Sequence, residues 1–409
     1  MLFAGFLRFI VREGAVRFVD ERGLDVVIGD GSAPRCTVRQ HRPLGLDIAI
    51  NPPLVMAEAY MDGLFDIEDG TVLDLVEVIM RNYAYVERHP LMKIASWLWR
   101  QGRLFGQYNP IRRARRNVAH HYDLSDELYD LFLYRDRQYS CAYFHDPRDS
   151  LETAQENKKR HIAAKLLLDR PGLKILDIGS GWGGLALFLA KLADADVTGV
   201  TLSTEQHNVS QKRAADAGLS SCVRFHLRDY REDDGVYDRI VSVGMFEHVG
   251  RRHYVQFFRK MHRLLANDGV ALLHSIGRSE PPQPTNPFIR KYIFPGGELP
   301  ALSDVLAAVE RSGLIVTDIE ILRLHYADTL AEWQRRFQAN RDKVKQLYDE
   351  RFCRMWELYL SACEMSFRHQ NMMVFQMQLA KRQDVVPRVR DYITDFDRES
   401  AAQRIIAAE

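Results

Sequence analysis

The sequence has few cysteines, almost no net charge and no long uninterrupted apolar run, and each shortage removes a class of protein. The five cysteines form an odd, scattered set without metal-like spacing, which indicates free thiols in a reducing compartment and not a disulfide framework. A net charge of +1 gives no overall field toward nucleic acid. No segment reaches the roughly 18 apolar residues of a membrane span, and the apolar start at 1–11 matches a signal peptide poorly. We therefore expect a cytoplasmic protein that contacts a membrane only from outside.

Length and composition predict more than one domain. At 409 residues the chain is longer than one typical domain, and its 46% hydrophobic content is ordinary for a globular protein with a sizeable core. The pattern predicts a hairpin at 16–28 and helices between 56 and 86. We expect a small mixed α+β domain at 1–89, a basic linker at 90–118 and a larger domain at 119–409.

The linker combines positive charge with large apolar side chains. Seven basic residues and no acidic one lie between Lys93 and Arg116, interleaved with Trp97 and Trp99. A solvated surface is one interpretation. The other is adhesion to anionic phospholipid, to which each basic side chain near the surface contributes about 1 kcal/mol. Nucleic acid is disfavoured because no recognised motif accompanies the charge, so we expect the partner to be a bilayer surface. The oligomeric state stays open, a homodimer included.

From residue 117 onward, apolar strand-like runs alternate with helical periods. Such alternation predicts an α/β fold with a doubly wound, Rossmann-like parallel sheet covered on both faces. Helical spacing from 329 to about 365 interrupts the alternation and reads as an insertion or cap. The strands are expected at 173–178, 195–201, 222–228, 236–243, 270–276, 314–322 and 372–379.

The segment K-I-L-D-I-G-S-G-W-G-G at 174–184 is an apolar strand that ends in a glycine-rich turn. Its glycines fit the dinucleotide pattern G-x-G-x-x-G. However, Asp177 would repel a pyrophosphate and suits a ligand that carries an ammonium and a sulfonium. The next strand ends in Thr201 and Leu202, where a nicotinamide site wants an acidic residue for the ribose. S-adenosylmethionine is therefore the expected ligand, and a nicotinamide oxidoreductase is the alternative.

Titratable side chains follow the later strands. Asp229 comes after the third strand, Glu247 after the fourth, and His274 lies at the end of the fifth. Because the carboxyl ends of parallel strands meet at one edge of a sheet, we expect these residues beside the glycine turn in one pocket. Each alone could be a satisfied polar group. A metal site made by Cys141, Glu247 and His274 is a weaker alternative, since their spacing is not that of paired ligands.

Eight motifs follow one another in order along the larger domain: H-Y-D-L-S at 121–125, Y-S-C-A-Y-F at 139–144, L-D-I-G-S-G-W-G at 176–183, V-T-L-S-T-E-Q at 200–206, D-R-I-V-S-V-G-M-F-E-H-V-G at 238–250, L-H-S-I-G at 273–277, K-Y-I-F-P-G at 291–296 and H-Y-A-D-T-L at 325–330. With them the chain resembles the cyclopropane-fatty-acyl-phospholipid synthases and the mycolic acid cyclopropane synthases from about residue 119 to its end. The N-terminal domain, with E-A-Y-M-D-G at 58–63, resembles that family's lipid-facing module more weakly. Ser180 departs from the family, which commonly has cysteine there.

The resemblance implies an enzyme that delivers the methyl group of S-adenosylmethionine to a cis double bond of a phospholipid acyl chain. The carbocation then loses a proton from the added methyl and closes to a cyclopropane, which requires a dry site and a nearby base. The family's base is a bound bicarbonate ion, and the resemblance places its ligands at Cys141, Glu247, His274, Tyr326 and, through its backbone, Ile276. Histidine and tyrosine suit an anion, whereas the protonation of Glu247 stays open.

The resemblance also implies the cofactor positions and one more cysteine. Cys363 matches a residue assigned as active in the family, but a cationic alkylation needs no enzyme nucleophile, so an apolar wall residue is an equal interpretation. Quenching of the same cation by water or hydride, and a lipid-binding protein without catalysis, are the remaining alternatives. The cofactor contacts are expected at Tyr139, Ser140, Asp177, Gly179, Gly181, Thr201, Leu202 and Gln206, with Asp229 and Tyr230 near the adenine.

Overall fold

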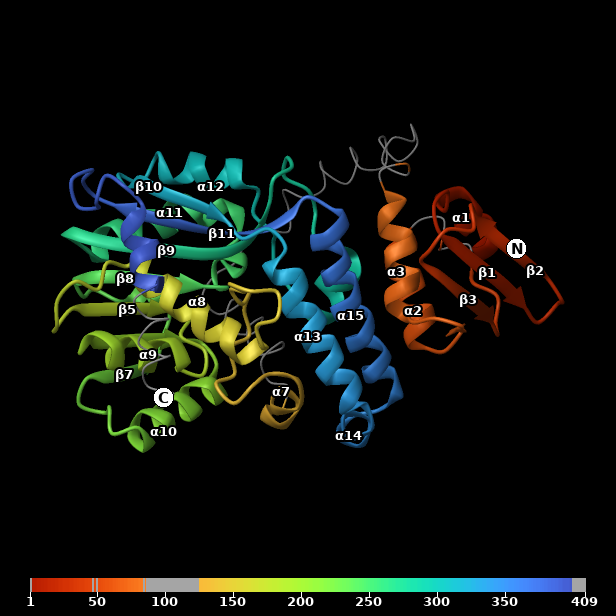
Figure 1. The fold of residues 1–409 in the computed structure, drawn as a ribbon, viewed down its shortest axis with the longest axis horizontal. Helices are drawn as coiled ribbons and strands as arrows, with labels where there is room; N and C mark the ends of the chain where they lie inside the picture. Colours follow the sequence, from red (N-terminus) through yellow and green to blue (C-terminus); the bar gives the residue numbers. More distant parts are fainter. Residues whose placement is uncertain (1, 46–47, 49–50, 84, 86–124, 399–409) are drawn as a thin grey trace. The chain divides into compact units, whose positions relative to one another are not determined.

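The computed structural model describes residues 2–45, 48, 51–83, 85 and 125–398 (Figure 1). The basic segment at 93–116 lies outside these residues. The chain divides into two compact units, and each is described by itself. The first comprises Met1–Gly106, Gln283–Pro295 and Leu330–Asn371, and the second Gln107–Pro282, Gly296–Thr329 and Met372–Glu409.

The first unit is built on a four-stranded sheet in the order β2-β1-β3-β4. The hairpin predicted at 16–28 is present as β1 and β2, which pair antiparallel, and the apolar face of α1 is buried in the core of this unit. Thr71 begins α3 with a capping box that it shares with Asp74. The elements are α1 (Leu2–Ile10), β1 (Ala15–Asp20), β2 (Asp25–Gly29), β3 (Arg35–Gln40), α2 (Pro52–Met61), β4 (Phe65–Glu68), α3 (Val72–Arg81), η6 (Ile289–Ile293), α14 (Arg341–Leu347) and α15 (Glu350–His369).

The helical interruption expected from residue 329 is present, but it joins the first unit. Helix α15 packs on α2 and α3, where Met365 lies among Val72 and Val76 on a second apolar stripe of α3. This division differs from the expected boundaries at 1–89 and 119–409. The cause is tertiary packing: an apolar face of α3 is covered in part by a helix from much later in the chain.

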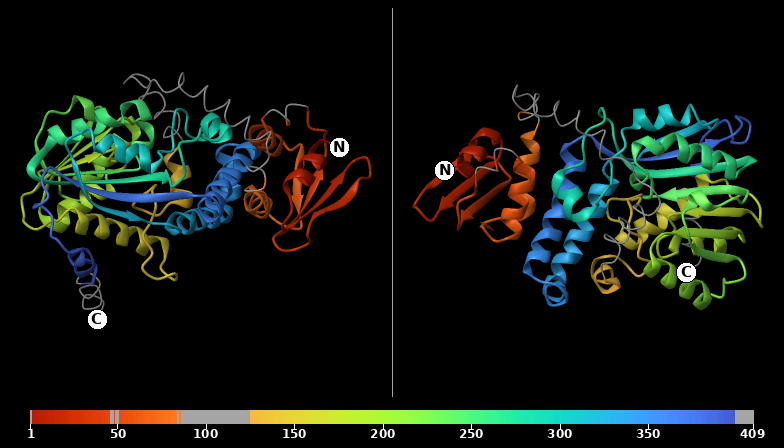
Figure 2. Two further views of the ribbon diagram at one scale, coloured as in Figure 1. Left: turned by 90° about the horizontal axis from the view of Figure 1, so that it is seen from above. Right: turned by 180° about the vertical axis from the view of Figure 1, so that it is seen from behind.

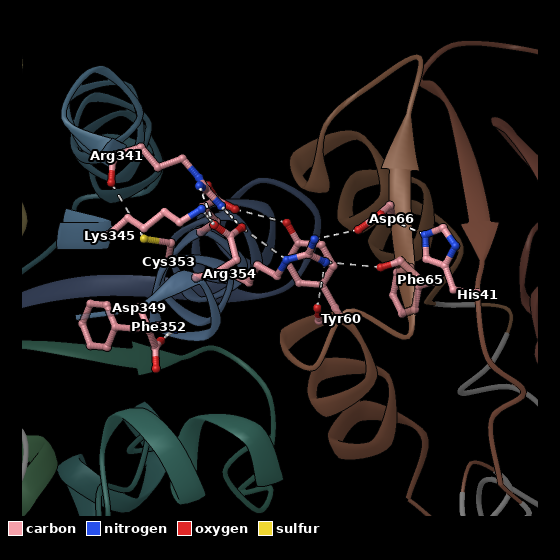
Figure 3. A network of polar contacts seen from close by, with 12 residues as sticks. His41, Tyr60, Phe65, Asp66, Arg341, Lys345, Asp349, Phe352, Cys353 and Arg354 are labelled. Carbon is pink, nitrogen blue, oxygen red and sulfur yellow. Dashed lines mark hydrogen bonds and ion pairs between the residues drawn. The ribbon is translucent and has the colours of Figure 1, made fainter. Parts of the chain in front are cut away.

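Polar contacts join α15 to the same small sheet (Figure 3). The guanidinium of Arg354 pairs with Asp66 at 2.7 Å and donates to the backbone oxygens of Tyr60 at 3.1 Å and Phe65 at 3.4 Å. The hydroxyl of Tyr60 in turn donates to Glu357 at 3.1 Å. The planar guanidinium of Arg354 thus donates hydrogen bonds to one carboxylate and two backbone carbonyls at once. The single ammonium group of a lysine cannot reproduce this geometry.

The second unit is an α/β structure around a seven-stranded sheet in the order β10-β11-β9-β8-β5-β6-β7 (Figure 1). All seven expected strands are present. The neighbours from β9 through β8, β5 and β6 to β7 are parallel, and β11 is inserted antiparallel between β9 and β10. The strands are β5 (Lys174–Ile178), β6 (Asp196–Thr201), β7 (Val223–Leu227), β8 (Tyr237–Val243), β9 (Leu265–Arg278), β10 (Ile315–Ile321) and β11 (Met372–Ala380).

Helices lie on both faces of this sheet (Figure 2). One apolar core joins it to α11 and α12, and a second joins it to α8, α9 and α10. None of the helices in the described ranges is long and apolar enough to cross a bilayer. The helices of this unit are α7 (Asp126–Phe132), α8 (Leu151–Lys165), α9 (Gly184–Ala193), α10 (Thr204–Asp216), α11 (Tyr254–Leu264) and α12 (Leu302–Val309); the boundary between the units falls within α13 (His325–Ala339).

Candidate active site

The glycine turn after β5 lies where the strand order reverses. From β5 the chain passes to β6 on one side and later returns to β8 on the other, which opens a crevice at the carboxyl ends of the strands. Gly179 has φ of +86° and Gly181 φ of +54°, conformations that favour glycine. A Cβ on Gly179 would lie 2.7 Å from the Cβ of Met245, whereas one on Gly181 would meet no atom within 4 Å. The turn therefore packs at Gly179 on the connection that follows the neighbouring strand β8, and it faces open space at Gly181.

That open space is a pocket, and all ten residues expected to contact the cofactor line it. They come from four places: the segment before α8, the end of β5 with its glycine turn, the end of β6 with the first turn of α10, and the segment after β7. Met245 and His248, which flank Glu247, also line it, and so does Gln138, which precedes the Y-S-C motif. The expected residues on its wall are Tyr139, Ser140, Asp177, Gly179, Gly181, Thr201, Leu202, Gln206, Asp229 and Tyr230.

Asp177 gives the pocket its negative charge. The side chain is buried, and its Oδ2 has no hydrogen-bond partner among the described residues. Burial raises the pKa of Asp177 to about 7, and Lys158 acts in the opposite direction. A buried carboxylate with an oxygen that lacks a hydrogen-bond partner fits a cationic ligand, because the ligand supplies the missing opposite charge. The residues present therefore fit S-adenosylmethionine.

Lys158 on α8 is a site residue that the sequence reasoning missed. It is fully buried, and its Nζ donates to Oε1 of Gln138 at 2.6 Å and to Oγ of Ser140 at 2.9 Å. Burial lowers its pKa to about 7. Its positive charge also lowers the pKa of Cys141 and of His274, so it influences the ionisation of both residues. The sequence carries no clear signal for this residue, because α8 is rich in polar residues and a lysine within it looks solvated.

Glu247, His274 and Ile276 are brought together at the ends of β8 and β9. Oε1 of Glu247, which lies on η4 (Phe246–His248), accepts from the backbone N–H of Ile276 at 2.7 Å. Its Oε2 is buried without a hydrogen-bond partner in the described part of the chain. Burial raises the pKa of Glu247 to about 7, opposed by backbone N–H donors. This carboxyl group can therefore exchange a proton near neutral pH, as a general acid or base must.

Cys141 and Tyr326 are joined through the segment at 139–144 and the first turn of α13. The backbone N–H of Ala142 donates to Oγ1 of Thr329 at 3.0 Å, one helical turn from the buried Tyr326. Burial raises the pKa of the Cys141 thiol well above its usual value, so the group is a neutral thiol. That Cys141 and Tyr326 bind an anion together with His274 stays a prediction.

Cys363 belongs to the first unit, on α15, and not to the unit that holds the pocket. Burial raises the pKa of its thiol to about 12, so the thiolate that a nucleophile requires is scarce at neutral pH.

The alternative of a metal site gains no support from the structure. Within the ranges that it describes, no group of three or more His, Cys, Asp or Glu side chains is placed so that it could hold a metal ion.

The fold and the pocket together define a class of protein. A seven-stranded sheet with one antiparallel strand, a glycine turn at the reversal point and an unpaired acid beneath it are the parts of a class I S-adenosylmethionine-dependent methyltransferase. A coclaurine N-methyltransferase bound to SAH has the same fold, with a TM-score of 0.64 over 80% of this chain and 99% of that one, although the identity is 21%.

The family model described as mycolic acid cyclopropane synthetase matches residues 110–377, and the chain belongs to this family. It is 37% identical over 330 residues to cyclopropane-fatty-acyl-phospholipid synthase of Escherichia coli K12, a match that covers 80% of this chain and 83% of that protein. It is 42% identical over 258 residues to a probable fatty acid methyltransferase of Pseudomonas putida, covering 61% of this chain and 65% of that one, just under two thirds. The structure of mycolic acid cyclopropane synthase CmaA1 complexed with SAH and CTAB superposes with a TM-score of 0.62 at 36% identity, covering 66% of this chain and 99% of that one.

Proposed function

We propose that this methyltransferase converts cis double bonds of phospholipid acyl chains into cyclopropane rings. The observation that carries the proposal is the likeness to the Escherichia coli cyclopropane-fatty-acyl-phospholipid synthase, which extends over four fifths of the chain and beyond the methyltransferase core. Beside the pocket, Glu247 supplies a proton-exchanging group that a simple binding protein has no need to bury.

The chemistry sets what the residues must do. When bound, S-adenosylmethionine supplies an electrophilic methyl group on a positively charged sulfur. The π electrons of the cis double bond form the new bond to that methyl carbon, and the C–S electrons leave with the neutral thioether. The alkyl cation then gives up a proton from the added methyl, and the C–H electrons close the ring. Asp177 holds the cationic donor, and the buried walls exclude the water that would trap the cation.

The proton acceptor in this proposal is a bicarbonate held by Cys141, Glu247, His274, Tyr326 and the backbone of Ile276. The residues fit such a group in one respect that the structure describes: Glu247 and His274 are buried polar groups at adjoining strand ends, and Oε2 of Glu247 lacks a partner within the described residues. A protonated Glu247 would donate to the anion, and an ionised one would accept from its hydroxyl.

A methyl-branched product is the second candidate. It is favoured by the likeness to tuberculostearic acid methyltransferase UfaA1 of Mycobacterium tuberculosis, at 39% identity over 283 residues, or 66% of each chain. The same cation gives a methylene-branched chain when a hydride shifts before the proton is lost, and reduction of that double bond by a separate hydride donor and a proton would give the methyl branch. The sequence motifs are compatible with both the cyclopropane and the methyl-branched product, so the product must be measured.

The product test uses phosphatidylethanolamine with cis-monounsaturated chains and S-adenosylmethionine with a CD3 methyl group. We expect mass spectrometry to find a gain of CD2, with one deuterium lost, and no bond that ozone cleaves. An ozone-sensitive product or two further hydrogens would indicate a branched chain, and retention of CD3 with oxygen a hydroxylated one. Either result would refute cyclopropanation. Enzyme with the Glu247→Gln substitution serves as the control for background lipid.

The proposal includes reversible attachment to the cytoplasmic face of the membrane through the basic segment at 93–116. Replacing Arg112, Arg113, Arg115 and Arg116 with glutamine should weaken binding to vesicles that contain anionic lipid by up to about 1,000-fold, because each basic residue contributes about 1 kcal/mol and about 1.4 kcal/mol is a factor of ten. Binding of S-adenosylhomocysteine should not change. The matched control replaces four exposed arginines elsewhere, Arg17, Arg39, Arg148 and Arg382, and so removes the same charge. Equal loss in both variants would refute a specific role.

A further inference from the structure

A row of buried polar side chains lies behind His274, on the face of the sheet covered by α8. Strand β11 places Gln376 directly opposite His274 in the antiparallel register. Nε2 of Gln376 lies 3.1 Å from Nδ1 of His274, and both side chains are buried. Neighbouring residues of β11, such as Phe375 and Met377, face the opposite, apolar core. A glutamine in this apolar strand is costly unless its amide is fully hydrogen-bonded.

The other end of the amide is fixed by Lys165. Its Nζ lies 2.7 Å from Oε1 of Gln376, and the lysine is fully buried at the end of α8. An ammonium group only donates hydrogen bonds, so the amide oxygen must face Lys165 and the amide NH2 must face the imidazole. Nδ1 of His274 therefore accepts a hydrogen bond, and in the neutral ring the proton must sit on Nε2.

Lys165 is itself held in place by acidic groups. It pairs with Glu320, whose Oε2 also lies 2.6 Å from Nε2 of His161. The other ring nitrogen of His161 is 2.9 Å from Asp397, in the helical segment at 391–398. Burial opposes ionisation of Glu320, but His161 and Lys165 outweigh it and hold the pKa of this carboxyl well below its usual range. Burial lowers the pKa of Lys165, and its ion pair with Glu320 opposes that shift and so favours the ammonium form that orients the amide.

The charged groups that face His274 favour the neutral ring. Burial lowers the pKa of His274 to about 3, and the positive charges of Lys158, Lys165 and His161 add to this, with only Glu320 acting in the opposite direction. A neutral imidazole donates through one nitrogen alone. Which nitrogen donates is therefore decided by its partner.

We propose that Gln376, oriented by Lys165, is a positioning residue that fixes His274 as the Nε2–H tautomer and so makes it a permanent hydrogen-bond donor toward the reaction site. The consequence for catalysis rests on the proposed function, in which His274 holds an anionic base. The tautomer itself does not rest on it, because the hydrogen-bond chain is complete without any ligand.

The test is the Gln376→Glu variant. It keeps the shape of the side chain but replaces the NH2 group that donates to His274 with an oxygen that accepts. A carboxylate accepts from Lys165 and also from His274, so the imidazole proton should move to Nδ1 and Nε2 should become an acceptor. In full-length protein labelled with 15N in histidine rings, we expect His274 to change from the Nε2–H to the Nδ1–H chemical-shift pattern at pH 8. The resonance is assigned by its loss in His274→Gln.

Methyl transfer from labelled S-adenosylmethionine to lipid, whatever the product, is the second readout. We expect Gln376→Glu to lose about 100-fold or more in kcat at pH 8, in the range typical of one lost electrostatic donor, with affinity for S-adenosylhomocysteine unchanged within about 2-fold. Activity should recover as pH falls, because the new carboxylate raises the pKa of His274 and an imidazolium donates through both nitrogens. A merely structural defect would reduce activity at every pH.

Gln378→Glu is the matched control. Gln378 lies two residues along the same strand on the same face, and its amide bonds to Lys165 O, Thr317 and Tyr392 instead of to a histidine. The Gln378→Glu variant should leave the His274 tautomer and the shape of the pH profile unchanged.

If Gln376→Glu does not fold, Lys165→Met provides the second test, since an amide that Lys165 no longer orients should give a mixture of His274 tautomers. An Nδ1–H or charged His274 in the parent protein, an unchanged tautomer in Gln376→Glu, or a changed tautomer with unchanged kcat would each overturn the proposal.

Discussion

Replacing Glu247 with glutamine should abolish methyl transfer to lipid while cofactor binding stays intact. Glutamine keeps the acceptor for the backbone N–H of Ile276, which lies 2.7 Å from Oε1 in the parent. It replaces Oε2, which is buried and unpartnered within the described residues, by an NH2 group that cannot exchange a proton. With a pKa raised to about 7 by burial, the parent carboxyl serves in either protonation state at neutral pH. The loss of kcat should be about 100- to 10,000-fold, as for other acid–base groups.

Calorimetry with S-adenosylhomocysteine and turnover with labelled donor separate the two effects. Glu247 does not line the cofactor pocket, so the dissociation constant should change by less than about 2-fold. Glu298→Gln is the control: Glu298 is buried nearby, its backbone N–H donates to Glu247 O, and its carboxylate accepts from the backbone of Arg251. That variant should keep most of its activity. Near-parental turnover in Glu247→Gln would remove this residue from the mechanism.

The affinity for S-adenosylmethionine should fall as pH drops from 7 to 5.5, and Asp177 should account for much of that slope. In the free protein, burial raises the pKa of Asp177 to about 7, so at lower pH the carboxyl is mostly neutral. A cationic ligand binds the ionised form better and therefore releases a proton on binding. By linkage, affinity is full above pH 7 and weakens by up to about 10-fold per pH unit below it. The ligand's own amino group, with an ordinary pKa of about 8, stays charged in this range.

Asp177→Asn isolates this contribution. The variant should bind S-adenosylmethionine about 10- to 100-fold more weakly at pH 7.5, because it loses a buried opposite charge. Titrations at pH 6 in buffers of different ionisation enthalpy should show about one proton fewer released than in the parent. Lys158, whose pKa burial also lowers to about 7, accounts for any proton release that remains. Asp196→Asn, at an exposed ion pair with Arg224, is the control. Equal pH slopes in parent and Asp177→Asn would show that Asp177 does not hold the cation.

The part of the structure that follows from local pattern could be predicted. All seven strands of the large sheet were expected, since each is a short apolar run bounded by turn residues. The glycine turn and Asp229 were expected at one edge because the carboxyl ends of parallel strands meet there, whereas the full set of ten pocket residues came from the family resemblance. For Cys141 and Tyr326, however, neither periodicity nor spacing indicated a role, and they came from the family resemblance alone.

What could not be predicted depends on contacts between distant segments. Nothing local in 372–380 says that this strand enters the sheet antiparallel, between two strands that precede it in the chain. Nothing local in 350–369 says that this helix packs on α3 of the first unit. Lys158 and Gln376 were missed for a related reason: a polar residue in a helix or strand looks like a solvated position until its buried partners are known.

The late arrival of β11 has a consequence for the order in which the enzyme becomes competent. During synthesis from the N-terminus, the turn after β5 and every strand end that borders the cofactor pocket emerge before residue 372. At that stage β9 is an open sheet edge, since its neighbour on that side is β11, and β10 has no strand to pair with. The residues of the cofactor pocket are therefore synthesised early. His274 gains its neighbour Gln376 only when β11 enters the sheet. Pairing of β11 with β9 is therefore the folding step that completes the surroundings of His274.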